Sequence, residues 1–146
     1  MSMLIQPLYH VDDFFESYAK ALEHHDTKLM AHHYFVPCTF LSDDATTLFT
    51  EASKLEGLFN QGVMFYKQFG IASVKADVRN KKPWSEKIIH ARVNWQYCDS
   101  KNQPIYNCDY QYILKPDKNN NLKIHLSVSL NEKERMEAWM NKRKSK

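Results

Sequence analysis

The segment Ile89-His90-Ala91-Arg92-Val93-Asn94-Trp95-Gln96-Tyr97 decides the fold, because apolar and polar residues alternate along its whole length. A period of two places successive side chains on opposite faces of a β-strand. The same alternation recurs in residues 106–114 and 122–130, and a shorter run occupies residues 72–78. Short polar loops at residues 99–103 and 116–121 separate the last three runs, as hairpins require. The sequence therefore predicts an antiparallel sheet with one buried, apolar face.

The loop lengths also predict how these strands pair, starting from Ser100 opposite Gln103. The predicted pairs are Val93–Tyr110 and Trp95–Cys108 on the apolar face, and Asn94–Asp109 and Arg92–Gln111 on the polar face. Across the second hairpin, Leu114 opposite Leu122 places Ser127 beside Asp109 and His125 beside Gln111, again on the polar face. A slip of one residue would exchange the two faces, which burial of the apolar side disfavours.

The residues before Gly70 follow a helical period instead. We expect helices over residues 12–25, with Asp12 or Asp13 as N-cap, over residues 26–34, with Asp26 as N-cap, and over residues 50–69, with Gly70 as the stop. Two short strands, 37–41 and 46–49, flank the turn at Asp43-Asp44. With no linker or internal repeat, the prediction is a single α+β domain with a core of about 12–130, a C-terminal helix 131–142 and a basic tail 143–146.

The composition limits the classes of protein to which the chain can belong. It has 146 residues, of which 43% are hydrophobic, and this is rich enough for a packed core. The formal net charge of +3 is too small to indicate nucleic acid, and three glycines are too few for Gly-rich phosphate loops. There is no signal-peptide pattern, no membrane-length apolar run and no C-x-x-C among the three cysteines. We therefore expect a cytoplasmic protein with free thiols.

Several local patterns accompany this order of elements. They are Ala21-Leu22 with Asp26, then Leu29 and Tyr34, then Ala91-Arg92-Val93-Asn94-Trp95, Tyr110-Gln111-Tyr112 and Leu122-Lys123-Ile124. From about residue 14 to residue 128 the chain resembles the nuclear transport factor 2-like superfamily, and specifically its SnoaL-like branch. The resemblance implies a cone-shaped, cystatin-like fold, in which N-terminal helices pack on a curved antiparallel sheet and leave a pocket at the open end. Members of the family use this pocket for isomerisation, dehydration, cyclisation or epoxide opening on apolar substrates, and others are binding or dimerisation modules.

The resemblance implies a small apolar ligand in the cone cavity, without a cofactor, and two interpretations remain open. The chain is either a cofactor-free isomerase, dehydratase or hydrolase, or a non-catalytic dimerisation or partner-binding module whose cavity is filled by its own side chains. The residues expected to line the pocket are Phe14, Tyr66, Trp95, Tyr106, Cys108, Tyr110 and Tyr112.

Tyr18 and His33 are the catalytic candidates, because both are expected to project from helices towards the pocket. A neutral His33 would take a proton while Tyr18 donates to a carbonyl oxygen. The alternative is that both are core residues whose polar atoms are satisfied within the protein. The alternation places no Asp or Glu on the apolar face, which counts against an acid–base isomerase.

The polar face of the sheet is the second candidate site. Arg92, Asn94, Asp109, Gln111 and His125 are expected to form a homodimer interface in which Arg92 and Asp109 pair across the two-fold axis, and the alternative is a solvated face. The pairs His24-His25 and His32-His33 lack the i,i+4 spacing of zinc ligands on a helix, so no metal is expected. The basic tail is interpreted as a solvated helix end, without a nucleic-acid or membrane role.

Overall fold

The computed structural model describes residues 5–144, which form one six-stranded sheet and four helices. The elements are α1 (Ile5–Glu23), α2 (Thr27–His32), β1 (Tyr34–Leu41), β2 (Thr46–Phe49), α3 (Ala52–Phe69), β3 (Ser73–Pro83), β4 (Ile89–Cys98), β5 (Pro104–Pro116), β6 (Leu122–Ser129) and α4 (Glu132–Lys144). The strand order is β2-β1-β6-β5-β4-β3. The predicted α+β class is confirmed, but the sheet is not wholly antiparallel, because β1 pairs with β6 in parallel. Residues 145–146 of the predicted basic tail lie outside the described residues.

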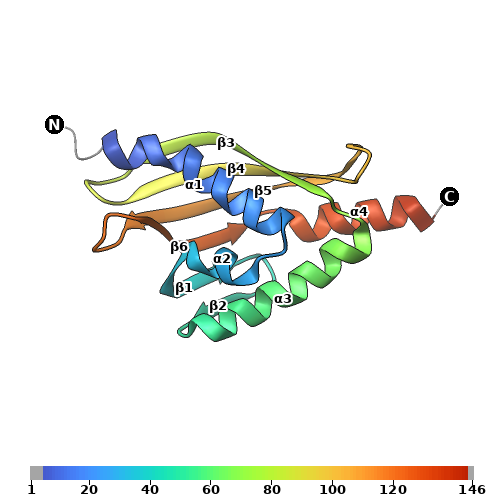
Figure 1. Cartoon of the computed structure of the whole chain (residues 1–146), viewed down its shortest axis with the longest axis horizontal. Coiled ribbons are helices and arrows are strands. Elements are labelled where there is room, and N and C mark those ends of the chain that lie inside the picture. Colours follow the sequence, from blue (N-terminus) through green and yellow to red (C-terminus); the bar gives the residue numbers. More distant parts are fainter. Residues whose placement is uncertain (1–4, 145–146) are drawn as a thin grey trace.

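Helices α1, α2 and α3 lie on one side of the curved sheet, and α4 extends from the end of β6 (Figure 1). Helix α1 packs mainly on β3, whereas α3 packs against α2 and β2. The apolar residues of β4 and β5 face these helices and form the core together with Val11, Phe15 and Leu55, which are fully buried. Among the described residues, no helix is long and apolar enough to cross a membrane.

The predicted pairing of β4 with β5 is confirmed. Val93 pairs with Tyr110 and Trp95 with Cys108 on the inner face, and the outer-face pairs Asn94–Asp109 and Arg92–Gln111 are also present. The loop at residues 99–103 sets this register, since the Asp99 side chain accepts hydrogen bonds from the backbone N–H groups of Lys101 and Gln103. A local turn therefore aligns the strands as the alternation of apolar residues requires.

The predicted pairing of β5 with β6 is wrong. Leu122 pairs with Pro116 instead of Leu114, because the Asp117 side chain closes a tighter loop by accepting from the N–H groups of Asn119 and Asn121. Further along β6, Ile124 and Leu126 pair with two consecutive residues of β5, so His125 is the extra residue of a β-bulge. The bulge reverses the alternation for the rest of the strand.

Ser127 therefore lies on the inner face, where it pairs with Tyr112 and is 2% exposed. The expectation that Ser127 lies beside Asp109 and His125 beside Gln111 is corrected accordingly. Leu126 and Val128, which the alternation placed inside, lie on the outer face, where they pair with Ile113 and Gln111. The one additional residue thus places a hydroxyl on the inner face of the sheet, where apolar side chains were expected.

Two of the predicted helix ends are confirmed. The Asp26 side chain accepts a hydrogen bond from the N–H of Leu29 and caps α2, and Gly70 ends α3 in the left-handed conformation. The start of the first helix was predicted wrongly, since α1 begins at Ile5 and Asp12 and Asp13 lie inside it. Pro7 does not prevent this start, because the first turn of a helix needs no N–H at that position. Tyr34 begins β1 and pairs with Ile124, so it does not belong to α2.

Candidate functional site

Two adjoining compartments, which share part of their lining, lie between α3, α4 and the inner face of the sheet. The compartment that we call the inner chamber has a volume of about 340 Å³. Its walls are formed by Tyr18, Leu22, Met30, Tyr34, Phe40, Leu58, Phe59, Gln61, Gly62, Phe65, Tyr66, Trp95, Tyr97, Tyr110, Tyr112, Ser127 and Glu132. The lining is thus mainly aromatic, with tyrosine hydroxyls, one serine hydroxyl and one carboxylate as its principal polar groups.

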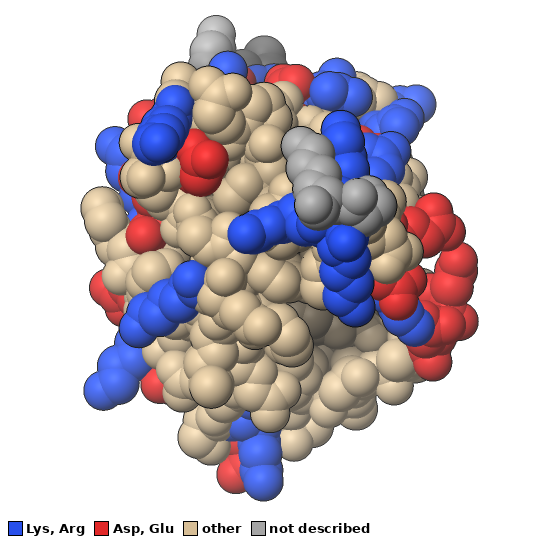
Figure 2. All heavy atoms as spheres, turned by 90° about the vertical axis from the view of Figure 1, so that its right-hand side faces the viewer, with Lys and Arg blue, Asp and Glu red and all other residues tan. Residues whose placement is uncertain are grey.

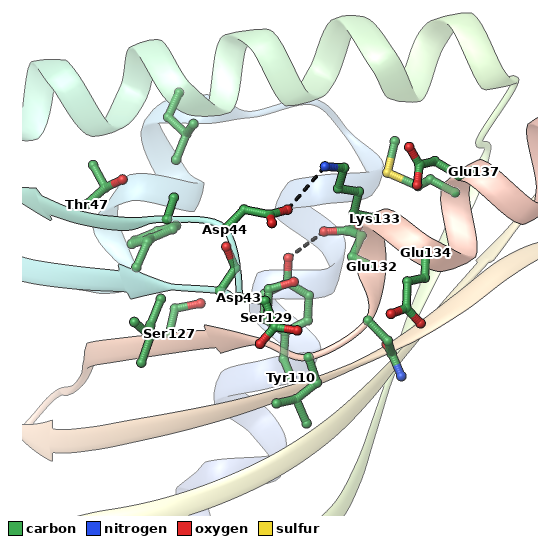
Figure 3. A pocket seen from close by; sticks show the side chains of 18 of the residues that line it. Asp43, Asp44, Thr47, Tyr110, Ser127, Ser129, Glu132, Lys133, Glu134 and Glu137 are labelled. Carbon is green, nitrogen blue, oxygen red and sulfur yellow. Dashed lines mark hydrogen bonds and ion pairs between the residues drawn. The ribbon is translucent and has the colours of Figure 1, made fainter.

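The second compartment, which we call the vestibule, has a volume of about 710 Å³. It lies between the turn from β1 to β2, the end of β6 and the first turns of α4 (Figure 3). The vestibule and the inner chamber share Phe40, Leu58, Tyr110, Ser127 and Glu132 as lining residues. These five residues therefore border both compartments, and we call this place the junction.

Glu132, the first residue of α4, places its carboxylate at this junction. One carboxylate oxygen accepts a hydrogen bond from the hydroxyl of Tyr106 at 3.0 Å, and the other accepts one from the hydroxyl of Tyr110. The expectation that no acid reaches the inner face is wrong. Strand alternation could not reveal Glu132, because its position depends on where β6 ends and α4 begins. The only signal in the sequence was an acidic residue at the start of the predicted C-terminal helix.

The tyrosine hydroxyls of the inner chamber are linked in pairs. Trp95 donates from Nε1 to the hydroxyl of Tyr112 at 2.8 Å, and the hydroxyls of Tyr18 and Tyr34 are bonded to each other. Because Tyr112 accepts from Trp95, its own hydroxyl proton remains available for a ligand. Burial raises the pKa of Tyr112, Tyr18 and Tyr34 well above the usual value for tyrosine. These phenols are therefore neutral hydrogen-bond donors at physiological pH.

Ser127 contributes a hydroxyl that the protein itself does not use. The residue is 2% exposed, and among the described residues its side chain has no hydrogen-bond partner. It lines both compartments, and Figure 3 shows it on the wall of the cavity formed by β6. Among the described residues no buried side-chain N or O atom lacks a hydrogen-bond partner, so the unpartnered Ser127 hydroxyl is open to the cavity, where it can bond to a polar atom of a bound molecule.

Tyr18 and His33 are in contact, but only Tyr18 faces the inner chamber. Their rings stack with centroids 5.1 Å apart. His33 Nδ1 lies 2.7 Å from the carbonyl oxygen of Leu29, and Nε2 lies 3.0 Å from the hydroxyl of Ser17. Burial lowers the pKa of His33. The expectation that His33 projects into the cavity is wrong, because it lines a separate surface cleft and both of its nitrogens have partners within the protein.

The residues predicted to line the pocket divide into two groups. Tyr66, Trp95, Tyr110 and Tyr112 do line the inner chamber. Phe14, Tyr106 and Cys108 do not, although all three were expected there: Phe14 borders the cleft with His33, Tyr106 lines a groove beside α4, and Cys108 is fully buried. Burial also raises the pKa of the Cys108 thiol, so this cysteine is not a thiolate nucleophile. Tyr106 still contributes to the site through its bond to Glu132.

With this geometry in view, comparison with known proteins gives the family. The family described as NTF2-like protein (DUF6841) matches residues 9–132. The chain belongs to this NTF2-like family. Among curated proteins, none matches this NTF2-like chain at a significant level. Its placement in the SnoaL-like branch stays a prediction.

Solved structures of similar proteins show the same NTF2-like fold. Aln2 from a Streptomyces species matches with a TM-score of 0.67 and 10% identity, over 84% of this chain and 88% of that one. A ketosteroid isomerase-like protein from Erwinia carotovora atroseptica matches with a TM-score of 0.64 and 8% identity, over 84% of this chain and 94% of that one. An NTF-2 like protein of unknown function from Shewanella oneidensis matches with a TM-score of 0.63 and 11% identity, over 85% of this chain and 98% of that one. Identities this low relate the folds alone.

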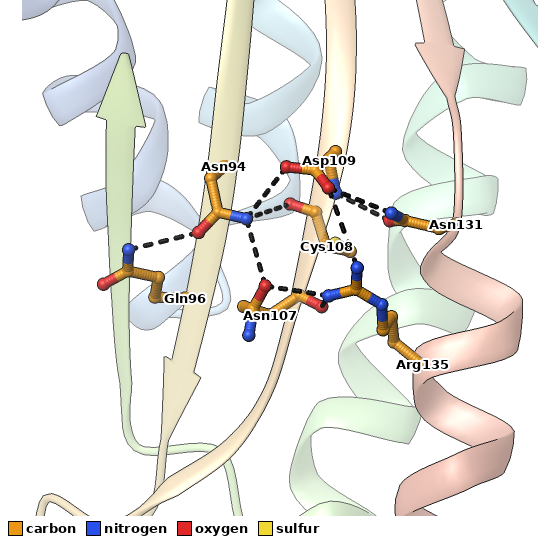
Figure 4. A network of polar contacts seen from close by, with 7 residues as sticks. All are labelled: Asn94, Gln96, Asn107, Cys108, Asp109, Asn131 and Arg135. Carbon is orange, nitrogen blue, oxygen red and sulfur yellow. Dashed lines mark hydrogen bonds and ion pairs between the residues drawn. The ribbon is translucent and has the colours of Figure 1, made fainter. Parts of the chain in front are cut away.

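On the outer face of the NTF2-like sheet, the polar residues form a network within one chain (Figure 4). Asn94 is 2% exposed and donates from Nδ2 to Asp109 at 3.0 Å and to Asn107 at 3.1 Å. Asp109 in turn accepts from the side chain of Asn131, and Arg135 lies 3.9 Å from its carboxylate. Asp109 thus has its charged partner in its own chain, whereas a pairing with Arg92 of a second copy was expected.

The remaining residues of the expected dimer interface lie elsewhere on the outer face. Arg92 is exposed. The side-chain oxygen of Gln111 lies 2.6 Å from Nε2 of His90. His125 stacks on Phe35 with ring centroids 4.6 Å apart. In residues 5–144, no group of three or more His, Cys, Asp and Glu side chains is arranged to hold a metal ion.

Proposed function

We propose that this NTF2-like protein binds a small, mainly apolar molecule in the inner chamber. The observation that carries the proposal is the aromatic chamber of about 340 Å³ with the Glu132 carboxylate and the Ser127 hydroxyl at its junction with the vestibule. Ligand sites in proteins are usually larger than about 300 Å³, mainly apolar and fitted with a few convergent polar groups. This favours a ligand-binding cone over one filled by its own side chains.

The polar groups give the chamber a defined chemistry. Glu132 can accept a proton, and Tyr112 can donate a hydrogen bond to an oxygen atom of a bound molecule. This pairing supports cofactor-free proton transfer, as in an isomerase or dehydratase, with Glu132 in the role that the sequence suggested for His33. The likeness to a protein described as ketosteroid isomerase-like agrees with this chemistry.

Two glycines of α3 allow a matched test of the binding site. A Cβ atom at Gly62 or at Gly57 would meet no other atom within 4 Å. Gly62 lines the inner chamber, whereas Gly57 is exposed and lines neither compartment. Leucine at position 62 would therefore occupy ligand space, and leucine at position 57 would not.

The experiment is a titration of the protein with soluble naphthalene derivatives that carry different polar groups. Binding is followed by NMR on the indole N–H of Trp95, which lies in the chamber wall. We expect the wild type and Gly57→Leu to bind at least one derivative alike, and Gly62→Leu to bind about ten-fold more weakly or not at all. Absence of binding by every derivative, or equal binding by the two variants, would overturn the proposal.

The outer face of the sheet supports a second candidate function, formation of a homodimer. The bulge at His125 turns Leu126 and Val128 to this face, next to Leu41 and Leu48, which are 38% and 63% exposed. Exposed apolar side chains in one patch are typical of interaction surfaces. We expect sedimentation to give twice the chain mass of 17.3 kDa, and Leu48→Glu to shift the protein towards monomer. A monomer at micromolar concentration would overturn this second proposal.

A further inference from the structure

The vestibule has a charge opposite to that of the whole chain. Its charged lining residues are Asp43, Asp44, Glu132, Glu134, Glu137 and Lys133. Five carboxylates and one ammonium give this lining a formal charge of −4, whereas the formal net charge of the chain is +3. In the view from the end where α4 lies, the largest group of acidic side chains is at the right-hand edge, and basic side chains are scattered elsewhere over a mainly uncharged surface (Figure 2). A hollow lined by one sign of charge attracts molecules of the opposite sign.

The one ammonium in this lining does not neutralise the junction. Lys133 pairs with Asp44 at 3.1 Å, and both side chains are largely exposed. Glu132 is only partly exposed, and its hydrogen-bond partners are the hydroxyls of Tyr106 and Tyr110, which carry no charge. Among the described residues, no Lys, Arg or His forms an ion pair with Glu132 within 4 Å. The carboxylate at the junction is therefore available to a positively charged ligand.

Ser127 provides a separate indication of a ligand at the same place. The residue is 2% exposed, and its hydroxyl has no partner among the described residues and opens on the cavity at the junction, which Glu132 also lines. A hydroxyl oxygen has two lone pairs, so it can accept a hydrogen bond from an ammonium N–H. Behind the junction, the rings of Tyr34, Tyr112 and Trp95 line the chamber, and aromatic faces attract organic cations.

We infer that the ligand is an amphipathic organic amine in its protonated form. Its apolar body occupies the inner chamber, and its ammonium group lies at the junction, where it donates to the carboxylate of Glu132 and the hydroxyl of Ser127. This inference rests on the proposed function and names the chemical class of the ligand. The other vestibule carboxylates, which include Asp43 and Glu137, raise the local concentration of such cations.

The test compares three ligands that share one ring system and differ in charge. They are 2-(2-naphthyl)ethylamine, the neutral 2-(2-naphthyl)ethanol and the anionic 2-naphthylacetate. At a salt concentration of about 20 mM we expect the amine to bind about ten-fold more tightly than the alcohol, with the carboxylate weakest, and we expect the preference to shrink at about 500 mM salt. Glu132→Gln should remove most of the preference for the amine. Glu86→Gln, which makes the same charge change at an exposed position outside both compartments, should leave it unchanged.

The outcomes separate this inference from the proposal on which it rests. If the alcohol or the carboxylate binds as tightly as the amine, the inference is wrong and the ligand-binding chamber stands. If none of the three binds, the proposed function fails and the inference falls with it. Should Glu132→Gln not fold, the order of the three affinities in the wild type at the two salt concentrations decides the question.

Discussion

The hydroxyl of Tyr110 donates a hydrogen bond to the carboxylate of Glu132, which joins the middle of β5 to the first residue of α4. Tyr106 donates to the second oxygen of the same carboxylate at 3.0 Å. The carboxylate also lies at the N-terminal end of α4, where the helix dipole stabilises negative charge. A single side chain from the last helix thus completes a cavity that is otherwise built by the sheet and the earlier helices.

Removing either tyrosine hydroxyl tests this connection. Tyr110→Phe and Tyr106→Phe should each lower the free energy of unfolding by about 1–3 kcal/mol, the usual contribution of a hydrogen bond to a charged group. The double variant should lose more than the sum, because the second change leaves the carboxylate with neither donor. Urea unfolding measures these differences. A double variant that loses no more than the single ones would show that Glu132 is already hydrated in the wild type.

Asn94 and Ser127 form a matched pair, since both are 2% exposed and polar. Nδ2 of Asn94 lies within hydrogen-bond distance of three acceptors on the outer face, whereas the Ser127 side chain makes no hydrogen bond among the described residues. Asn94→Ala should therefore lower the free energy of unfolding by about 2–3 kcal/mol, because Asp109 and its neighbours lose a buried donor. Ser127→Ala should change it by less than about 0.5 kcal/mol. Thermal and urea unfolding of both variants give the comparison.

A large destabilisation by Ser127→Ala would contradict the finding that its hydroxyl is unused. The same variant should weaken binding of an amine ligand while leaving the fold intact. Asn94→Ala provides the control, since it lies on the opposite face of the sheet and contributes nothing to the cavity lining.

How far the sequence predicted the structure differs between the two hairpins. Between Trp95 and Cys108, apolar alternation and loop length agree, so the register followed from the sequence alone. In β6 the alternation of apolar and polar residues is continuous in the sequence, but the bulge at His125 turns the residues after it to the opposite faces of the sheet. A bulge is a feature of the backbone conformation, and the pattern of polar and apolar residues does not reveal it. Ser127 was therefore placed on the wrong face.

The candidate site was predictable to the extent that it is made of strand residues. Tyr110 and Tyr112 were assigned to the cavity because alternate residues of a strand face the same side of the sheet. Glu132 was missed because it follows the last strand, and this alternation does not extend into a helix. His33 was misplaced for a different reason. Its backbone is helical, but its ring nitrogens contact the Leu29 carbonyl and the Ser17 hydroxyl outside the chamber, and the helical period does not specify such partners.

The helix starts provide a prediction of their own. Asp26→Ala should lower the free energy of unfolding by about 0.5–2 kcal/mol, because it removes the side chain that accepts from the Leu29 N–H. Asp13→Ala should have little effect, since Asp13 lies inside α1 and is exposed. Chemical unfolding of the two variants measures the difference. Equal losses would indicate that α1 begins near Asp13, as the sequence pattern suggested.

His33 predicts how stability depends on pH. Burial lowers the pKa of folded His33 below its ordinary value of 6.5, so between these two values the unfolded chain binds more protons than the folded one. The stability that this difference provides is complete above pH 6.5 and is lost as the pH falls towards the folded pKa. Burial also lowers the pKa of His25 and His125, which therefore contribute in the same direction.

We expect the free energy of unfolding to fall between about pH 7.5 and about pH 5, and His33→Gln to make this fall smaller. The variant is destabilised at all pH values, because it disturbs the bonds to Leu29 and Ser17, so the readout is the slope with pH and not the stability itself. An unchanged slope in His33→Gln would mean that His33 is protonated to the same extent in the folded and unfolded chains, and that its ring is open to water despite its stacking on Tyr18.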